Sequence, residues 1–222
     1  MISIKSIVEE IQTFLRNSNI ISVSDREVTT GTDTFIVDDS TSEFSLKNTG
    51  VKNVRLVIVN GSSMNFGDDY SVTYPSDTRT GSGIVHLTDE VDTGTVEIKY
   101  DYSHKGDRIY ADYPREEIAI SKYPRIGFDI ISSNTGNLNI GAKNQMTNMV
   151  VSIKAFADKK DEVDNMMDTM RKKFITNSKK FYNFPLITIQ NIYPLRYEDP
   201  KGKIVSRTGD FKLWFMEENL GD

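Results

Sequence analysis

The chain has 222 residues, of which 37% are hydrophobic and 27% charged, and its formal net charge is −5. This composition predicts one large or two small globular domains and excludes a disordered chain. With no cysteine and only two histidines, the sequence excludes disulfide frameworks, cysteine nucleophiles, iron–sulfur clusters and histidine-rich metal centres. No run of about twenty apolar residues exists to span a membrane. Lys5, Glu9 and Glu10 interrupt the first segment, which is therefore not expected to be a signal peptide.

The first segment is predicted to be an amphipathic helix that ends at the polar residues 17–19. Its apolar residues recur at three- and four-residue spacing: Ile4, Ile7, Val8, Ile11, Phe14 and Leu15. Such a helix cannot bury this stripe alone, so it must pack against a later part of the chain.

Residues 28–104 change to a two-residue period with frequent turn signals, which is typical of an all-β sandwich. The predicted strands are Thr34–Val37, Glu43–Leu46, Val54–Val59, Tyr70–Tyr74, Gly83–Leu87 and Thr95–Tyr102. Asn60-Gly61 directly follows an apolar run and predicts a tight hairpin. The segment carries five basic against twelve acidic residues, a net charge of −7. We therefore expect 28–104 to be a β domain inserted into a scaffold formed by 1–27 and 105–222.

The second half of the scaffold begins with a predicted linker at 105–125 and a short strand through Ile126, Phe128 and Ile130. The stretch Ser132–Asn148 is rich in Ser, Asn, Gly and Thr, and we interpret it as a long mobile loop.

A strand at Met149–Ala157 is expected to lead into a helix that Asp158 caps. The buried stripe of that helix would consist of Val163, Met167, Met170 and Phe174. Acidic residues at its start and basic residues at its end complement the helix dipole. Extended segments follow at Leu186–Ile192, Tyr193–Glu198 and Lys203–Arg207, with a turn at 199–202 and a last strand through Phe211, Leu213 and Phe215. The fold class is thus α+β, a mixed or antiparallel sheet flanked by two helices, with the inserted β-sandwich.

Candidate catalytic residues are few. His86 lies within a predicted strand, and a catalytic role would need a nucleophile and an orienting carboxylate that no local signature supplies. His104, near Asp107 and Asp112, could join a metal site, but one histidine with scattered carboxylates is a weak signal, so a loop at a domain boundary is the preferred interpretation. Neither phosphate-binding glycine motif is present. We expect a non-enzymatic protein without a cofactor or a resident metal ion.

Three further features have two interpretations each. The doublets Asp38-Asp39 and Asp68-Asp69 could offer oxygens to calcium, but the spacing of a calcium loop is absent, so hairpin turns are the preferred interpretation. Arg171–Phe184 mixes cations with aromatics and could bind single-stranded nucleic acid, although a helix end with inward aromatics explains it as well. Trp214 points away from the face of its apolar strand neighbours, where it could anchor a protein partner or lie beneath a helix.

The order of elements, with VSIKAFA passing into DEVDNMMDTMRKKF and a hairpin returning to FKLWFM, resembles the tail-terminator proteins of long-tailed bacteriophages. The segment VRLVIVNGSSMNFGDDYSVTY, followed by GIVHL and TVEIKYDY, resembles a small β-sandwich of phage structural proteins. The first resemblance covers roughly two-thirds of the chain, an ordinary size for one domain.

The resemblance implies a ring, typically a hexamer, that caps the tail tube and docks on the connector of the head. The implied partners are other copies of the chain, the tail-tube protein and a head connector or neck protein. DNA would pass through the ring without sequence-specific binding, which agrees with the acidic insert. The implied location is the head–tail junction of the virion, after assembly in the host cytoplasm. Candidate interface residues are Asn144, Gln145, Arg196, Lys201, Lys203, Arg207 and Trp214.

Two alternatives remain open at this point. The chain could be another neck or tail-completion protein, or the β unit could be a module that binds carbohydrate or another surface. Exposed aromatic clusters on the β unit would favour the second alternative.

Overall fold

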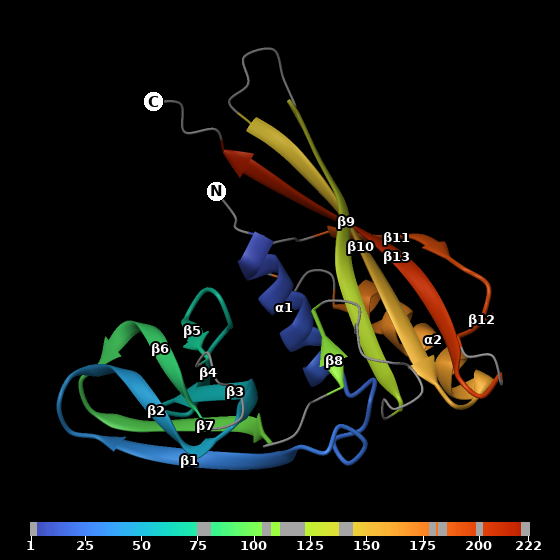
Figure 1. The fold of residues 1–222 in the computed structure, drawn as a ribbon. Coiled ribbons are helices and arrows are strands. Elements are labelled where there is room, and N and C mark those ends of the chain that lie inside the picture. The colour runs from blue at the N-terminus through green and yellow to red at the C-terminus, as the bar shows by residue number, and fades with distance from the viewer. Residues whose placement is uncertain are drawn as a thin grey trace. The chain divides into compact units, whose positions relative to one another are not determined.

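The computed structural model describes residues 4–74, 81–103, 108–111, 123–137, 144–177, 181, 186–198 and 202–218. The fold is α+β, with two helices and three sheets in these ranges. The chain forms two compact units, shown in Figure 1. The sandwich unit is Ser22–Asp107, and the scaffold unit combines Met1–Ile21 with Arg108–Asp222. Residues 22–27 thus belong with the β-rich unit rather than with the scaffold, where the sequence placed them.

The sandwich unit consists of two antiparallel sheets with the strand orders β1-β7-β3-β4 and β2-β6-β5. Its strands are β1 (Thr29–Val37), β2 (Thr41–Thr49), β3 (Val51–Val59), β4 (Ser62–Ser63), β5 (Tyr70–Thr73), β6 (Ser82–Val91) and β7 (Gly94–Tyr102). Both sheets contribute to one apolar core, in which Phe44 and Val85 meet Val57 and Ile98. The predicted hairpin is confirmed: Asn60 and Gly61 have φ angles of 50° and 84°, and they connect β3 to β4.

The scaffold unit has one six-stranded mixed sheet in the order β11-β13-β10-β9-β8, with β12 also paired to β13. Its elements are α1 (Ile4–Asn17), β8 (Ile109–Tyr110), β9 (Arg125–Asn137), β10 (Asn144–Ala157), α2 (Lys160–Thr176), β11 (Leu186–Ile192), β12 (Arg196–Tyr197) and β13 (Val205–Glu218). Only β8 and β9 among these described pairs run parallel. The long strands β9, β10 and β13 lie side by side with a strong twist (Figure 1).

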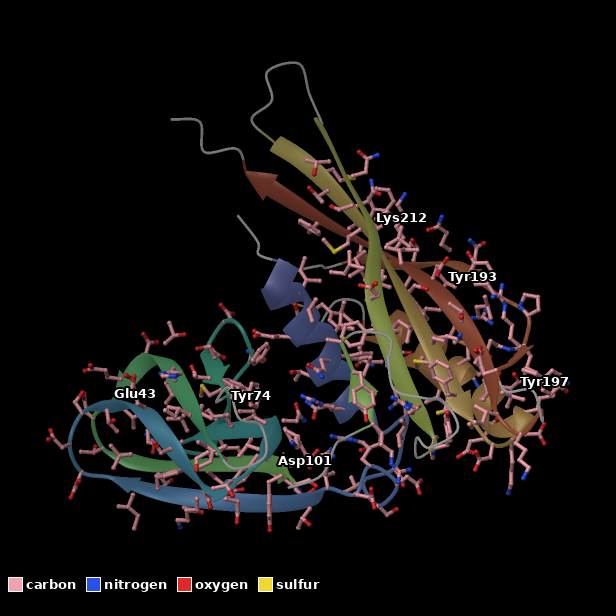
Figure 2. The ribbon with its side chains drawn as sticks, viewed as in Figure 1. Glu43, Tyr74, Asp101, Tyr193, Tyr197 and Lys212 are labelled. Carbon is pink, nitrogen blue, oxygen red and sulfur yellow. The ribbon has the colours of Figure 1, made fainter. Side chains whose placement is uncertain are left out.

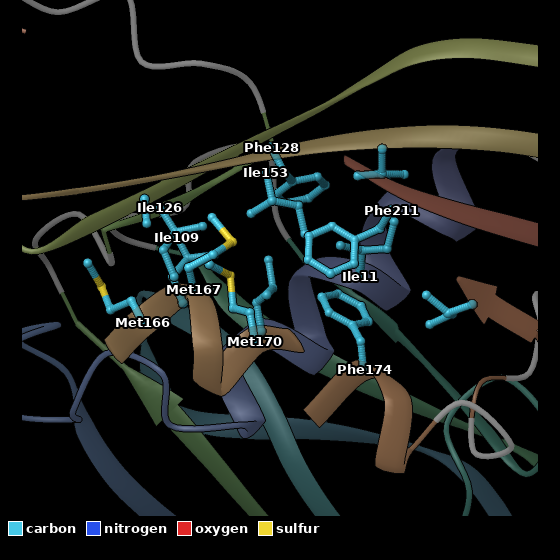
Figure 3. Close-up of a cluster of buried hydrophobic side chains, with 14 of the residues drawn as sticks. Ile11, Ile109, Ile126, Phe128, Ile153, Met166, Met167, Met170, Phe174 and Phe211 are labelled. Atoms are coloured by element: carbon cyan, nitrogen blue, oxygen red, sulfur yellow. The ribbon is translucent and has the colours of Figure 1, made fainter. Parts of the chain in front are cut away.

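Both helices contribute to the apolar core of the scaffold unit. The predicted buried stripe of α2 is confirmed and also includes Met166. Figure 3 shows the α2 side chains Met167 and Phe174 together with Ile11 from α1 and with Phe128 and Phe211 from the sheet. The first helix therefore buries its stripe in this core, as its spacing requires.

The interpretation of Ser132–Asn148 as a loop is wrong. Strand β9 continues to Asn137 and β10 begins at Asn144, and the two are paired in register from Gln145 opposite Asn137. The β9 side chains from Ile131 to Thr135 are all exposed, so burial gives this half of the ribbon no alternating pattern, whereas Thr147 and Met149 on β10 are buried. Backbone hydrogen bonds hold it, and Thr135 and Thr147 share a hydroxyl hydrogen bond of 2.9 Å.

Three smaller predictions also need correction. The second helix begins at Lys160, its N-cap position is Lys159, and no side chain caps it, so Asp158 does not have the predicted role. The two strands expected after residue 202 are one strand, β13, because no turn interrupts the pairing with β10. The short strand β8 lies inside the predicted linker.

Candidate interaction surface

One face of the scaffold sheet carries no helix in the described part of the chain. The buried residues of α1 and α2 share a core with Val151, Ile153 and Phe211, so both helices pack on the same side of the sheet. Because side chains alternate along a strand, Ser152 and Lys212 point to the opposite side. We call this opposite side the outer face. No helix of the described part covers Trp214 there.

On the outer face, strand register places an aromatic residue and a cation next to the start of β11. Trp214 lies opposite Leu186 on β11, and Lys212 lies opposite Thr188. The Lys212 ammonium is 4.3 Å from the centroid of the Trp214 ring, a cation–π contact. The indole Nε1 donates a hydrogen bond of 3.4 Å to the Thr188 hydroxyl. We name these four residues the Trp214 patch.

The Trp214 patch combines apolar surface with positive charge. Leu186 keeps 51% of its surface exposed although it is aliphatic, and Trp214 is half-buried. An aromatic ring held by neighbours loses little conformational freedom when a partner covers it. The patch is therefore suited to contact another protein surface.

The other end of the outer face is covered by the segment between β11 and β13. Tyr193 donates a hydrogen bond of 2.7 Å from its hydroxyl to Asp210, whose side chain is buried. This hydrogen bond and the negative charge of Asp210 raise the pKa of Tyr193 above its ordinary value. Figure 2 shows Tyr193, Tyr197 and Lys212 along one flank of the sheet.

A second polar cluster surrounds Glu198. Its carboxylate is 2.6 Å from the Lys154 ammonium and also accepts a hydrogen bond from the Ser206 hydroxyl. Burial alone would raise the pKa of Glu198, but the hydrogen bonds from Lys154 and Ser206, with the charges of Lys154 and Arg196, hold it below its usual value. The cluster fastens the covering segment to β10 and β13.

The predicted interface residues do not form one group. Arg196 and Lys203 are exposed, and Arg196 lies on the strand pair that borders the outer face. Arg207 points to the helix side instead, where it forms an ion pair of 3.0 Å with Asp164 of α2. Its surroundings thus indicate a structural role within the scaffold unit.

Three of the predicted interface residues have no described side chain. Asn144 and Gln145 are paired in β10, opposite Glu218 and Glu217, and their side chains lie outside the described part. Lys201 lies outside the described residues altogether, as does the turn predicted at 199–202 except for Gly202.

Sequence reasoning placed Lys212 beside Trp214 without selecting it as an interface residue, and it missed Leu186 and Thr188. The alternation of β13 signals that Lys212 shares a face with Trp214. The register between β11 and β13, which shifts near Ile189, could not be derived from the sequence because no local pattern encodes it.

His86 has the neighbours that the sequence could not show. Its Nε2 lies 2.9 Å from the Thr73 hydroxyl, and its Nδ1 lies 3.2 Å from a Glu43 oxygen. The three residues form a row across the sheet β2-β6-β5, where Glu43 lies directly opposite His86. Glu43 is 69% exposed, so water reaches this row. The arrangement matches a cross-strand polar ladder.

The acidic doublets behave as turn residues. Asp69 accepts hydrogen bonds from the Asn65 backbone and side chain, which closes the turn before β5. Within the described ranges, no three acidic or histidine side chains converge as a metal site. His104 lies outside those ranges.

The aromatics of the predicted basic–aromatic run point inward where the structure describes them. Phe174 and Phe181 are buried, with ring centroids 5.9 Å apart. Their burial leaves neither ring free to stack on a base. Residues 178–180 and 182–185 of this run lie outside the described part.

No protein-family model matches this sequence, and neither does any curated protein. Neither described helix is long and apolar enough to span a membrane.

Proposed function

We propose that this protein is a non-enzymatic structural protein of a long-tailed phage, a tail terminator that assembles as a ring. The ring would cap the tail tube, contact a head connector or neck protein, and let DNA pass without sequence-specific binding. It would be located at the head–tail junction of the virion, after assembly in the host cytoplasm.

The observation that carries this proposal is the outer face of the scaffold sheet. A sheet face that no described helix covers and that exposes Leu186 and Tyr193 has the composition of a protein-contact surface. The element order of the scaffold, which underlies the resemblance to tail terminators, supports the same proposal.

A capping role needs geometry rather than chemistry. A subunit that presents two different surfaces to its neighbours makes heterologous contacts, and these close into a ring when the rotation permits. One side of such a ring can match the last ring of the tube. The other side ends polymerisation because it does not repeat the tube interface.

Carbohydrate binding by the sandwich unit receives no support from its aromatics. Tyr70 and Tyr100 are buried, and Phe35, Phe66 and Tyr102 pack against the same core. A sugar-binding surface uses exposed rings, which the described part of the sandwich turns inward instead.

Sedimentation velocity of the purified chain, alone and with preassembled tail tubes, tests the proposal. We expect a ring, either free or formed on the tube end, and negative-stain images should show it capping tubes. A chain that remains monomeric under both conditions would contradict the proposal.

A further inference from the structure

The sandwich unit ends in a surface that is strongly acidic and carries an exposed aliphatic side chain. The turn between β1 and β2 contributes Asp38 and Asp39, and the end of β6 with the following turn contributes Asp89, Glu90 and Asp92. All five are exposed. We call these five residues together with Ile36 the acidic tip.

Hydrogen bonds and register bring the members of the acidic tip together. The Ser40 hydroxyl donates a hydrogen bond of 2.7 Å to Glu90, which links the two turns. Thr41 lies opposite Val91, and Val37 lies opposite Gly94. Neither the stretch 36–41 nor the stretch 88–95 contains lysine or arginine, so nothing within these turns neutralises the charge.

Ile36 makes the acidic tip more than a solvated charge cluster. It is 84% exposed, the largest exposure among the large hydrophobic residues of the described part. An exposed aliphatic side chain at the end of the strand that leads into Asp38 and Asp39 has the arrangement of an interface anchor beside a polar rim.

The Trp214 patch is complementary to the acidic tip both in apolar surface and in charge. Leu186 and Trp214 offer apolar surface to an aliphatic anchor, and Lys212 offers a positive charge to the carboxylates. Arg196 adds an exposed cation towards the other end of the outer face. The exposed carboxylate Asp129 lies on β9, which β10 separates from the β13 strand that carries Lys212.

We propose that the acidic tip of one copy docks on the Trp214 patch of a second copy of this chain. Ile36 would cover Leu186 and Trp214, while Asp38 and Asp39 approach Lys212. The two surfaces differ, so the contact is heterologous and can continue from copy to copy around a ring. This inference rests on the proposed function, because it names the surfaces by which the ring closes.

A charge exchange tests the contact on the full-length chain. The face variant is Lys212→Glu, and the tip variant carries Asp38→Lys with Asp39→Lys. Each variant alone should weaken self-association at low ionic strength by about tenfold or more, because like charges then meet at the contact. An equimolar mixture of the two should restore assembly, since each variant tip then faces a complementary patch.

Two control variants change charge elsewhere: Lys172→Glu has the same charge change as the face variant, and Glu97→Lys has half that of the double tip variant. Lys172→Glu lies on the exposed side of α2, and Glu97→Lys lies on an exposed position of β7. Both should assemble as the wild type does, and thermal melting should show that all variants fold.

The outcomes separate this inference from the proposed function. If the single variants assemble like the wild type, or if the mixture fails to restore assembly, the docking contact is overturned while a ring remains possible through other surfaces. If the wild type does not assemble even with tail tubes, both the ring function and this contact are overturned. The contact is supported only if each single variant weakens assembly and the equimolar mixture of the two restores it.

Discussion

The Asn60 side chain occupies the space that a Cβ on Gly94 would need. Asn60 accepts a hydrogen bond of 2.9 Å from the Thr95 amide and donates one of 3.3 Å to the Thr93 carbonyl. It thereby joins the β3–β4 turn to the β6–β7 turn. A Cβ at position 94 would overlap the Asn60 amide group, and the φ of Gly94 is +130°.

Gly94→Ala should therefore lower the free energy of unfolding by about 2 kcal/mol or more, through steric overlap and backbone strain. Gly61→Ala is the matched control, because Gly61 also has a positive φ but nothing lies within 4 Å of the position that a Cβ would take there. It should cost about 1 kcal/mol. Urea unfolding of both variants checks the difference, and equal losses would show that the Asn60 contact adds nothing.

Asp101 holds a buried charge cluster in the sandwich unit. Its two oxygens lie 3.3 Å from Arg26 and 2.6 Å from Arg55, and both Arg26 and Asp101 are fully buried. Asp101→Ala should lower the free energy of unfolding by about 3 kcal/mol or more, because the buried Arg26 charge then loses its ion pair with Asp101. Glu97→Ala, at an exposed position of the same strand, should change it by less than about 0.5 kcal/mol. Chemical denaturation measures both, and a similar small effect for the two would contradict the prediction.

Glu198 should make the scaffold unit sensitive to acid. Since the pKa of Glu198 is lowered in the folded state, its stabilisation is complete above its unfolded pKa of about 4.3 and is lost as the pH falls through the folded value. Glu198→Gln should cost about 1 kcal/mol at neutral pH, and the difference from the wild type should shrink below about pH 4. Urea titrations across this range test it. A difference that does not vary with pH would show that packing, not charge, accounts for the loss.

Removing the sandwich unit should leave a folded scaffold. Gln12 of α1 donates a hydrogen bond of 3.1 Å to the Ile109 carbonyl, and Ile21 and Ile109 share the scaffold core. The chain on either side of the insertion is therefore held within one unit. A variant in which a short Gly-Ser linker replaces 22–107 should melt cooperatively in calorimetry. An insoluble or non-cooperative product would show that the scaffold depends on the sandwich.

Elements with strong local signals were predictable from the sequence. The Asn60-Gly61 turn requires two positive φ angles, and the methionine stripe of α2 repeats at helical spacing; both signals depend on neighbouring residues alone. The end of β9 and the start of β10 carried no such signal, because the side chains from Ile131 to Thr135 are exposed on both faces. Polar residues there indicated a loop, while the pairing that holds them comes from the partner strand.

The candidate surface was predictable only in part. The alternation along the last strand correctly predicted that Trp214 points away from the core. The neighbours of Trp214 on β11 and the partners of His86 depend on strand register between distant segments, and a shift of one residue would turn every side chain over. The contact of Arg207 with Asp164 was not predictable for a related reason, because Asp164 lies on a helix that precedes Arg207 by many residues.

The exposed ribbon formed by β9 and β10 has a consequence for how such a protein changes over evolutionary time. Its reach depends on ladder pairing, and β13 pairs with the same stretch of β10, so residues can be gained or lost in matched pairs on all three strands without disturbing the core. Each pair of residues added to a strand extends the ribbon by about 7 Å and leaves every other side chain on its original side. Related proteins could thus adjust their span to different assemblies in small, regular increments.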